Sequence, residues 1–293
     1  PVISISPDTF DVTLTSGQTA TDTITITNSG NGPLTWEISL GDRPELIWYK
    51  FDETGQAATQ NYANPQTAVG NAMAPVLGGL TMGGTGASGS ALIGSGGSSS
   101  TDYVDTGWQT NLGTGDWTIS MWLNNFPTTP ASTRYHFGDT GASSFRCFTG
   151  GVAGNGGLML RGPVADVNIT GLTTGPHIVD YVYDSSVPEI RGYVDGVLNV
   201  TVPQTALNIT STDVFKVGGY STSVGLEVGE LMDEFKFYNR AIDISENRAD
   251  WLTFNPTTGT VPAGGSVDVV LTFDPTGLLG GEYTTKIVVA SND

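Results

Sequence analysis

The 293-residue chain is poor in cysteine, in basic residues and in long apolar runs. Its single cysteine, Cys147, has no partner for a disulfide within the chain, and we interpret it as a small buried hydrophobic residue. No apolar run approaches the length of a membrane span, which argues against direct membrane insertion. Eleven Lys and Arg stand against 29 Asp and Glu, a net charge of -18, so nucleic acid and anionic membrane surfaces are poor partners.

The composition favours strands and turns over helices. Hydrophobic residues make up 38% of the chain and charged residues only 14%, which is enough for a sizeable core. The polar remainder is rich in Thr, Ser, Asn and Gly, and these residues suit pleated surfaces and turns. An acidic, disulfide-free chain of this kind is typical of bacterial exteriors, so we predict an extracellular, cell-surface or secreted location. Its carboxylates also suit hard cations such as calcium.

Both ends of the chain alternate apolar and polar residues as half-buried strands do. The alternation is seen at residues 10–14, 23–27 and 34–38, and again at residues 267–273 and 283–290. Neither end alone has enough strands to close a sandwich, but together they supply about seven, which suffices.

The stretch between the two ends is richer in aromatic residues and begins and ends with strong strand patterns. We therefore predict one domain made of residues 1–44 and residues 246–293, interrupted by an inserted domain of residues 45–245. This division requires the two end segments to close around one core, with a separate core in the insert.

The end segments resemble a known family. Residues 28–38 (Asn-Ser-Gly-Asn-Gly-Pro-Leu-Thr-Trp-Glu-Ile) are similar to the middle of the immunoglobulin-like repeats common in bacterial surface proteins. Residues 250–266, which begin Asp-Trp-Leu-Thr-Phe-Asn-Pro, are similar to the second half of those repeats. In that family the two motifs follow each other closely, whereas here residues 39–249 separate them.

The insert resembles the laminin-G-like, concanavalin A-like jelly rolls. Residues 46–55 are similar to their first strand, residues 102–105 and 117–123 to their next landmarks, residues 191–198 to a hairpin, and residues 229–241 to their closing strand. The resemblance implies that the first and last strands pair antiparallel, which brings the ends of the insert together. The predicted fold class is all-β: a concanavalin A-like jelly-roll sandwich inserted in an immunoglobulin-like β-sandwich.

Two local signals within the insert bear on its loops. Asp195 and Gly196 lie between alternating segments, which is the pattern of a two-residue hairpin whose turn needs positive φ at both positions. The Gly- and Ser-rich run from Gly78 to Ser100 is interpreted as a long surface loop.

The most informative candidate site is a group of carboxylates on the first and last strands of the insert. Asp52 and Glu53 end the first strand of the insert, and Asp233 and Glu234 lie in its last strand, so antiparallel pairing would gather them at one end, with Glu230 nearby. Like charges so placed repel each other unless a cation neutralises them. The resemblance likewise implies a structural calcium between these strands. We predict Asp52 and Asp233 as side-chain ligands of Ca²⁺, with backbone carbonyls completing the shell; the alternative is a solvated acidic edge.

Catalytic patterns are weak. Jelly-roll glycosidases carry acids at i, i+2 and i+4 of one strand, but Glu230, Asp233 and Glu234 fall at i, i+3 and i+4, so alternation sends Asp233 to the other face. His136 and His177 have no metal-ligand spacing and are interpreted as structural or surface residues. We therefore predict that the chain is not an enzyme.

Aromatic residues bear on sugar binding, because exposed rings stack on pyranose faces. Trp117, Met121 and Leu123 alternate as core residues do. Trp108 lies in the loop-like residues 105–109 and is the best candidate for an exposed, ligand-binding platform.

These observations leave two hypotheses of function. The first is a calcium-stabilised structural or adhesive module of a bacterial surface protein or fibre, whose partners are neighbouring copies or domains of the same protein. The resembling repeats run on from an end such as Asp293 into a proline, and this chain starts at Pro1, so the resemblance also implies a tandem array or filament. The second is a carbohydrate-binding module of a secreted polysaccharide-degrading enzyme, whose partners are extracellular glycans.

Overall fold

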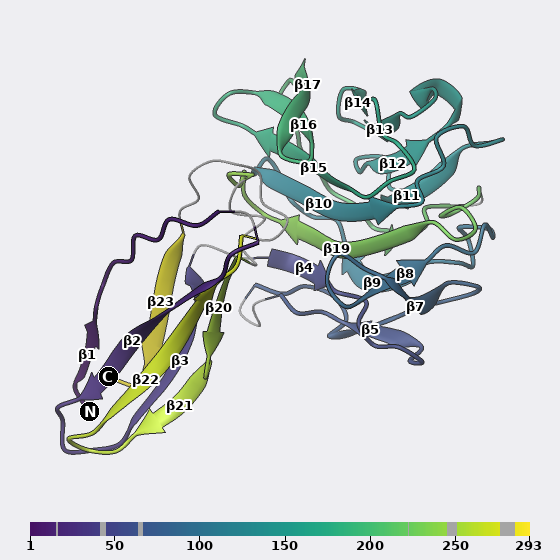
Figure 1. Ribbon diagram of the computed structural model, residues 1–293. Helices are drawn as coiled ribbons and strands as arrows, with labels where there is room; N and C mark the ends of the chain where they lie inside the picture. The colour runs from purple at the N-terminus through teal and green to yellow at the C-terminus, as the bar shows by residue number, and fades with distance from the viewer. Residues whose placement is uncertain (16, 42–44, 64–66, 222, 245–250, 276–284) are drawn as a thin grey trace. The chain divides into compact units, whose positions relative to one another are not determined.

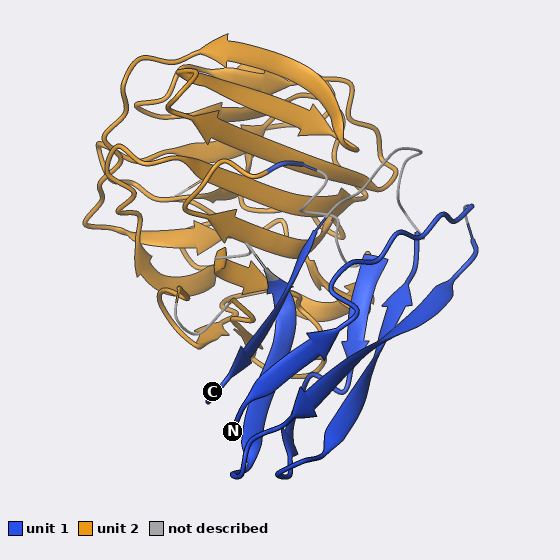
Figure 2. Cartoon of the chain, turned by 90° about the vertical axis from the view of Figure 1, so that its left-hand side faces the viewer, with its two compact units in different colours: residues 1–43, 243–293 blue, residues 44–242 orange. Residues whose placement is uncertain are grey.

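The computed structural model describes residues 1–15, 17–41, 45–63, 67–221, 223–244, 251–275 and 285–293. These residues form 23 strands and one short 3-10 helix, so the predicted all-β class is confirmed. The chain divides into two compact units (Figure 2). Unit 1 consists of residues 1–43 and 243–293, and unit 2 of residues 44–242.

Unit 1 is a β-sandwich to which both end segments contribute (Figure 1). One sheet has the order β1-β2-β22-β20 and the other the order β21-β3-β23. Strand β2 pairs with β22 along its whole length, so a strand near the N-terminus and one near the C-terminus share a ladder. The strands are β1 (Ile3–Ser6), β2 (Ala20–Asn28), β3 (Leu34–Gly41), β20 (Leu252–Asn255), β21 (Thr258–Val261), β22 (Ser266–Phe273) and β23 (Lys286–Ser291).

One hydrophobic cluster fills unit 1. Trp36 of β3 and Leu252 of β20 are both buried members of it, so the two end segments close around a single core. Asn28 is fully buried, and its side-chain amide donates to the carbonyl of Val261 at 3.1 Å, which ties the segments together. The alternation at residues 10–14 does not form a strand; instead Phe10 packs half-buried against this core.

Unit 2 is a larger sandwich of two main antiparallel sheets (Figure 1). The first has the order β17-β16-β15-β10-β19-β8-β7, with β4 also paired to β19, and the second has the order β14-β13-β12-β11-β18-β9; β5 and β6 form a small hairpin sheet. The elements are β4 (Glu45–Tyr49), β5 (Ala58–Gln60), β6 (Met73–Pro75), β7 (Thr81–Thr85), β8 (Ser90–Ile93), β9 (Val104–Gln109), β10 (Trp117–Asn124), β11 (Arg134–Gly138), β12 (Arg146–Thr149), η1 (Gly151–Ala153), β13 (Leu158–Arg161), β14 (Val167–Ile169), β15 (His177–Asp184), β16 (Glu189–Val194), β17 (Val197–Pro203), β18 (Val214–Val217) and β19 (Leu231–Tyr238).

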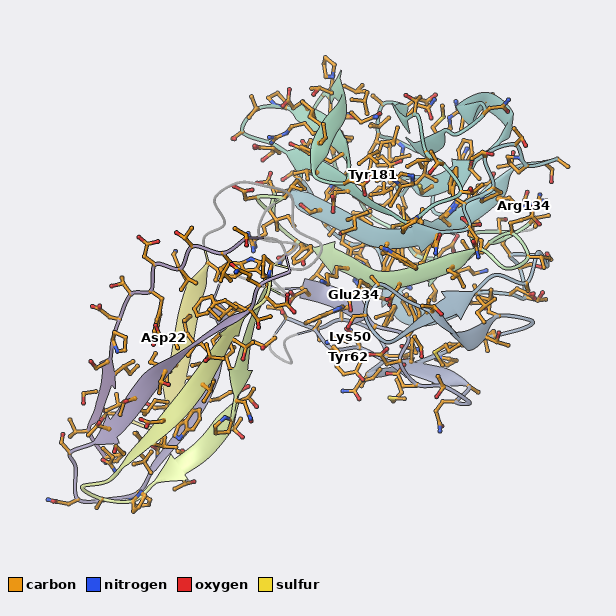
Figure 3. The ribbon with its side chains drawn as sticks, in the orientation of Figure 1. Asp22, Lys50, Tyr62, Arg134, Tyr181 and Glu234 are labelled. Atoms are coloured by element: carbon orange, nitrogen blue, oxygen red, sulfur yellow. The ribbon has the colours of Figure 1, made fainter. Side chains whose placement is uncertain are left out.

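Aromatic rings from the two sheets meet in the core of unit 2. Phe137 of β11 lies 5.7 Å from Phe235 of β19, centroid to centroid, in an edge-on arrangement. Each fully buried ring of this kind contributes about 1.5–3 kcal/mol of burial free energy. Tyr181, at the centre of the unit in Figure 3, donates its hydroxyl to the carbonyl of Leu158 in the opposite sheet at 2.7 Å. Cys147 is buried beside it, as predicted, and burial raises the pKa of its thiol.

Several predictions about the insert are confirmed and one is wrong. Strands β4 and β19 pair antiparallel, with Tyr49 opposite Phe235. Asp195 and Gly196 both have positive φ, 52° and 79°, in the turn between β16 and β17. The run from Gly78 to Ser100 is not a surface loop, because it contains β7 and β8, which pair with each other, and β8 also pairs with β19.

Candidate functional site

The carboxylates predicted to gather at one end of unit 2 separate into two pairs with different partners. Asp52 and Asp233 both bind the turn between β7 and β8. The amide of Ser90 donates to Oδ1 of Asp52 at 2.7 Å, and the amide of Ala87 donates to Oδ2 of Asp233 at 2.8 Å. A Cβ atom at Gly89, where φ is +67°, would lie 2.1 Å from Oδ1 of Asp52. Glycine therefore lets the turn approach these carboxylates.

Asp233 is the unusual member of this pair. Its side chain is fully buried, whereas Asp52 is exposed. Burial, and after it the neighbouring charge of Glu234, raises the pKa of Asp233 to about 7, although amides such as that of Ala87 oppose the shift. Among the described ion pairs none includes Asp233. A buried carboxyl of this kind is stabilised by a proton or by a cation.

The donor atoms at Asp52 and Asp233 suit calcium. Carboxylate oxygens are the hard ligands that calcium prefers. Within the described parts of the chain, no group of three or more His, Cys, Asp or Glu side chains is arranged to hold a metal ion. Asp52 and Asp233 would therefore supply the side-chain ligands, and backbone carbonyls and water would have to supply the rest.

Glu53 and Glu234 belong to an aromatic cluster instead. Glu234 accepts a hydrogen bond from the indole of Trp48 at 2.7 Å, and Glu53 accepts one from the hydroxyl of Tyr62 at 3.1 Å. The ammonium of Lys50 lies 4.3 Å from the centroid of Trp48 and 5.3 Å from that of Tyr62; Figure 3 marks Lys50, Tyr62 and Glu234.

Glu230 has a third set of contacts. Its Oε1 lies 2.7 Å from Nε2 of His136, and both side chains are fully buried. The ring of Phe126 stacks on His136 with 5.8 Å between centroids. Glu230, Asp233 and Glu234 thus bind separate partners, and His136 is a structural residue, as predicted.

The prediction of an exposed platform at Trp108 is wrong. Residues 105–109 are part of strand β9, not a loop, and alternation turns Trp108 inward. Its side chain is only 9% exposed and packs edge-on against Phe237, with 5.1 Å between centroids. It also contacts Phe215 at 5.8 Å. Trp108 belongs to the core of unit 2.

An aromatic surface does occur, on the outer side of the six-stranded sheet. Tyr135 of β11 and Tyr220, which follows β18, are both half-buried and stack with 4.8 Å between centroids and 28° between ring planes. The guanidinium of Arg146 lies 5.5 Å from the centroid of Tyr220. Phe148 of β12 is directly opposite Tyr135 in the ladder between β11 and β12. It belongs to a small apolar cluster separate from the main core, so these side chains lie on the outer face of the sheet.

A buried position without a side chain, Gly138, lies beside these rings. Gly138 pairs with Arg146 on one side and with Lys216 on the other. Its φ is +140°, and a Cβ atom there would lie 2.6 Å from the carbonyl oxygen of Phe145, so the position requires glycine. We call the surface made by Tyr135, Gly138, Arg146, Lys216 and Tyr220 the open face.

A cleft elsewhere in unit 2 is less suited to a specific ligand. Its volume is about 820 Å³, it lies near the end of β17, and its lining residues carry no charged side chain. Its one aromatic residue, Tyr183, is only 2% exposed, so the ring is not offered to a ligand. The open face is therefore the better candidate.

Comparison with known proteins gives one family match to a short segment of the sequence and several matches to the fold. The family model described as the viral BACON domain matches residues 2–48. No curated protein matches the chain. The choice between the two hypotheses of function therefore has to be argued from the structure.

Solved structures share the fold at low identity. The binding domain of botulinum neurotoxin DC in complex with rat synaptotagmin II has a TM-score of 0.51 at 12% identity, over 71% of this chain and 51% of that one. The same domain in complex with SialylT has a TM-score of 0.50 at 13% identity, over 70% and 50%. Domain 4 of AbnA, an extracellular arabinanase of Geobacillus stearothermophilus, in complex with arabinotriose, has a TM-score of 0.48 at 16% identity, over 72% and 97%.

This chain spans about half the length of the neurotoxin domains it matches. At these identities the likeness shows the fold alone, an all-β sandwich that also occurs in these binding domains.

Proposed function

We propose that this chain is a non-catalytic, extracellular glycan-binding module, and that its ligand lies on the open face of unit 2. The observation that carries the proposal is the half-buried stack of Tyr135 and Tyr220 beside Arg146. The electron-rich face of an aromatic ring attracts the C–H bonds of a sugar, and a few polar groups then fix its orientation.

The similar structures support a binding role without naming a ligand. The neurotoxin domains are described as binding domains in complex with rat synaptotagmin II or with SialylT. Folds of this kind host many functions, so the ligand has to be argued from the side chains of the open face. No helix among the described residues is long and apolar enough to cross a membrane.

The proposal combines the two sequence-based hypotheses. A glycan-binding module serves a polysaccharide-degrading enzyme or a surface adhesin equally well. The resemblance of the sequence to laminin-G-like domains and to immunoglobulin-like repeats of bacterial surface proteins favours the adhesin. Filament assembly and a tandem arrangement stay predictions.

Replacing Tyr220 with alanine is expected to weaken glycan binding about tenfold, because an aromatic contact contributes roughly 1.5 kcal/mol. The melting temperature should not change, since the ring is half-buried on the surface. The matched control is Tyr193→Ala, which removes a half-buried tyrosine from β16 in the other sheet. Isothermal titration with a glycan selected on an array measures both variants; equal affinity of Tyr220→Ala and the native chain would contradict the proposal.

We also propose that calcium binds between Asp52 and Asp233. The supporting observation is the buried Asp233 carboxyl, whose pKa rises from 3.8 to about 7 on folding. The folded state therefore holds this proton more tightly than the unfolded state. Stability that is present below pH 4 is lost as the pH rises toward 7, by at most about 1.4 kcal/mol per pH unit. Bound calcium would supply the missing positive charge and offset this loss.

The prediction is that 1 mM calcium raises the melting temperature of unit 2 by a few degrees at pH 8 and by less at pH 5. Asp233→Asn should remove both the calcium response and the pH slope between pH 4 and 7. Asp22→Asn, which neutralises an exposed acid of unit 1, is the control and should keep both. A native chain that shows the pH slope but melts identically with calcium and with a chelator would contradict calcium binding.

A further inference from the structure

Cations are scarce in this chain, yet three of the eleven lie in one row across the outer side of the six-stranded sheet. Lys216 of β18 is opposite Gly138 of β11, Gly138 is opposite Arg146 of β12, and Arg146 is opposite Arg161 of β13. Residues directly opposite in an antiparallel ladder extend their side chains to the same face. The row thus places positive charge on both sides of a position without a side chain.

The outermost cation of the row is neutralised. Arg161 forms a two-bond ion pair with Asp166, in which Nε lies 2.7 Å from Oδ1. The pKa of Asp166 is lowered by this hydrogen bond first, and weakly by Arg146 at longer range. The charge of Arg161 is therefore already matched.

The other two cations have weaker partners: Lys216 is directly opposite Asp105 of β9, and the side chain of Arg146 contacts that of Tyr220. Among the described ion pairs none includes Arg146 or Lys216. Arg146 lies over the ring of Tyr220, and the ammonium of Lys216 lies 4.0 Å from the centroid of Tyr103. Burial lowers the pKa of Lys216, and the charges of nearby Asp105 and Asp213 oppose that shift only in part.

This arrangement of charges lowers the stability of the unliganded protein. Like charges directly opposite each other in a ladder, here Arg146 and Arg161, are destabilising. Arg146 is half-buried without an ion-pair partner, so it also loses hydration. In a chain with 29 acidic residues, an arginine on this face without an ion-pair partner indicates that its counter-ion comes from the ligand.

We infer that the glycan bound on the open face carries a carboxylate, as uronic and sialic acids do, and that Arg146 holds this carboxylate while Lys216 contacts it from across Gly138. The inference rests on the proposed function and adds the class of sugar. The fork of a guanidinium matches a carboxylate with two parallel hydrogen bonds. Two strand spacings, about 10 Å, separate the backbones at Arg146 and Lys216, so their side chains flank Gly138 on the outer face.

The net charge of -18 does not prevent this binding. At physiological salt, charges farther than about 8 Å from the ligand are largely screened. A carboxylate on the open face is therefore governed by Arg146, Lys216 and the acids beside them, Asp105, Asp166 and Asp213, and not by more distant acidic residues. Affinity measured at physiological salt therefore depends mainly on the charges within about 8 Å of the ligand.

The test uses the whole chain and two matched ligand pairs: tetragalacturonate against its full methyl ester, and sialyllactose against lactose. Each pair compares a carboxylate-bearing glycan with a neutral counterpart. We expect at least one acidic member to bind at least tenfold more tightly than its neutral counterpart in isothermal titration. Arg146→Gln should abolish this preference. Arg161→Gln removes the same charge from the same row and should keep the preference, because Asp166 already neutralises Arg161.

The outcomes separate the two proposals. Equal binding of acidic and neutral members, lost in Tyr220→Ala, would overturn the inference and leave the proposed function intact. An acidic preference that Arg146→Gln and Arg161→Gln weaken equally would overturn the role of Arg146, since it would report general attraction. If no glycan on a broad array binds the folded chain, both the proposed function and the inference are wrong. Thermal melting of each variant establishes that it is folded.

Discussion

Trp108→Ala is expected to destabilise unit 2 by about 3–5 kcal/mol, which is the usual cost of removing a large buried aromatic side chain. The side chain packs edge-on against Phe237 and also contacts Phe215, so its loss leaves a cavity between the two sheets. Urea denaturation followed by far-ultraviolet circular dichroism measures the loss. The folded fraction should bind glycan with native affinity, because Trp108 is not on the open face.

The control for this variant is Trp48→Ala. Trp48 is half-buried in the same unit, with its indole bonded to Glu234, so its removal leaves no comparable internal cavity and should cost less. If Trp108→Ala were as stable as the native chain and lost glycan binding, Trp108 would be a ligand platform and the packing described above would be wrong.

Glu230→Ala is expected to cost about 3–5 kcal/mol, because it removes one partner of a fully buried pair and leaves His136 without its hydrogen bond. In the described structure Nδ1 of His136 has no hydrogen-bond partner, so Glu230 is the one that holds the ring. Glu230 also accepts the amide of Glu227 at 3.0 Å, and this bond is lost as well.

A double-mutant cycle separates the pair from its surroundings. His136→Phe combined with Glu230→Leu replaces both polar groups with apolar ones and should recover much of the stability. Glu227→Gln is the matched control, since its ion pair with Arg134 is partly exposed and should contribute about 1 kcal/mol or less. Additive effects of the two single changes in the cycle would show that His136 and Glu230 do not act as a pair.

Local patterns were enough to predict much of the fold. Alternation identified β2, β3 and β22, because each of these strands has one face on the core and one on solvent. Asp195 and Gly196 identified a hairpin because the turn needs positive φ at both positions. The pairing of β4 with β19 came from the resemblance to jelly rolls, and the structure confirms it.

The prediction of a loop from Gly78 to Ser100 was wrong because glycine there allows close packing of strands and does not mark a turn. In β7 a Cβ atom at Gly84 would lie 2.5 Å from the side chain of Leu231 in β19. A strand that approaches its neighbours this closely needs glycine and therefore has the composition of a loop. Trp108 misled in the same way, because Gly107, with φ of +64°, gives strand β9 a loop-like sequence.

The open face could not be found from local sequence at all. Tyr135 and Tyr220 come from distant parts of the chain and meet only because β11 and β18 are neighbours in the sheet. The row of Arg146, Gly138 and Lys216 likewise depends on the register of three strands. No spacing within one segment encodes either arrangement. Of the predicted carboxylates, only Asp52 and Asp233 contact the same turn. Glu53, Glu230 and Glu234 bind other side chains, which the strand pairing alone could not predict.

Hydrogen–deuterium exchange of the whole chain with and without a bound acidic glycan tests the central claim, that the ligand lies on the open face. The account predicts protection in residues 134–138, 146–149 and 214–220. Protection confined to the turn between β7 and β8, beside Asp52 and Asp233, with none at the open face, would contradict it.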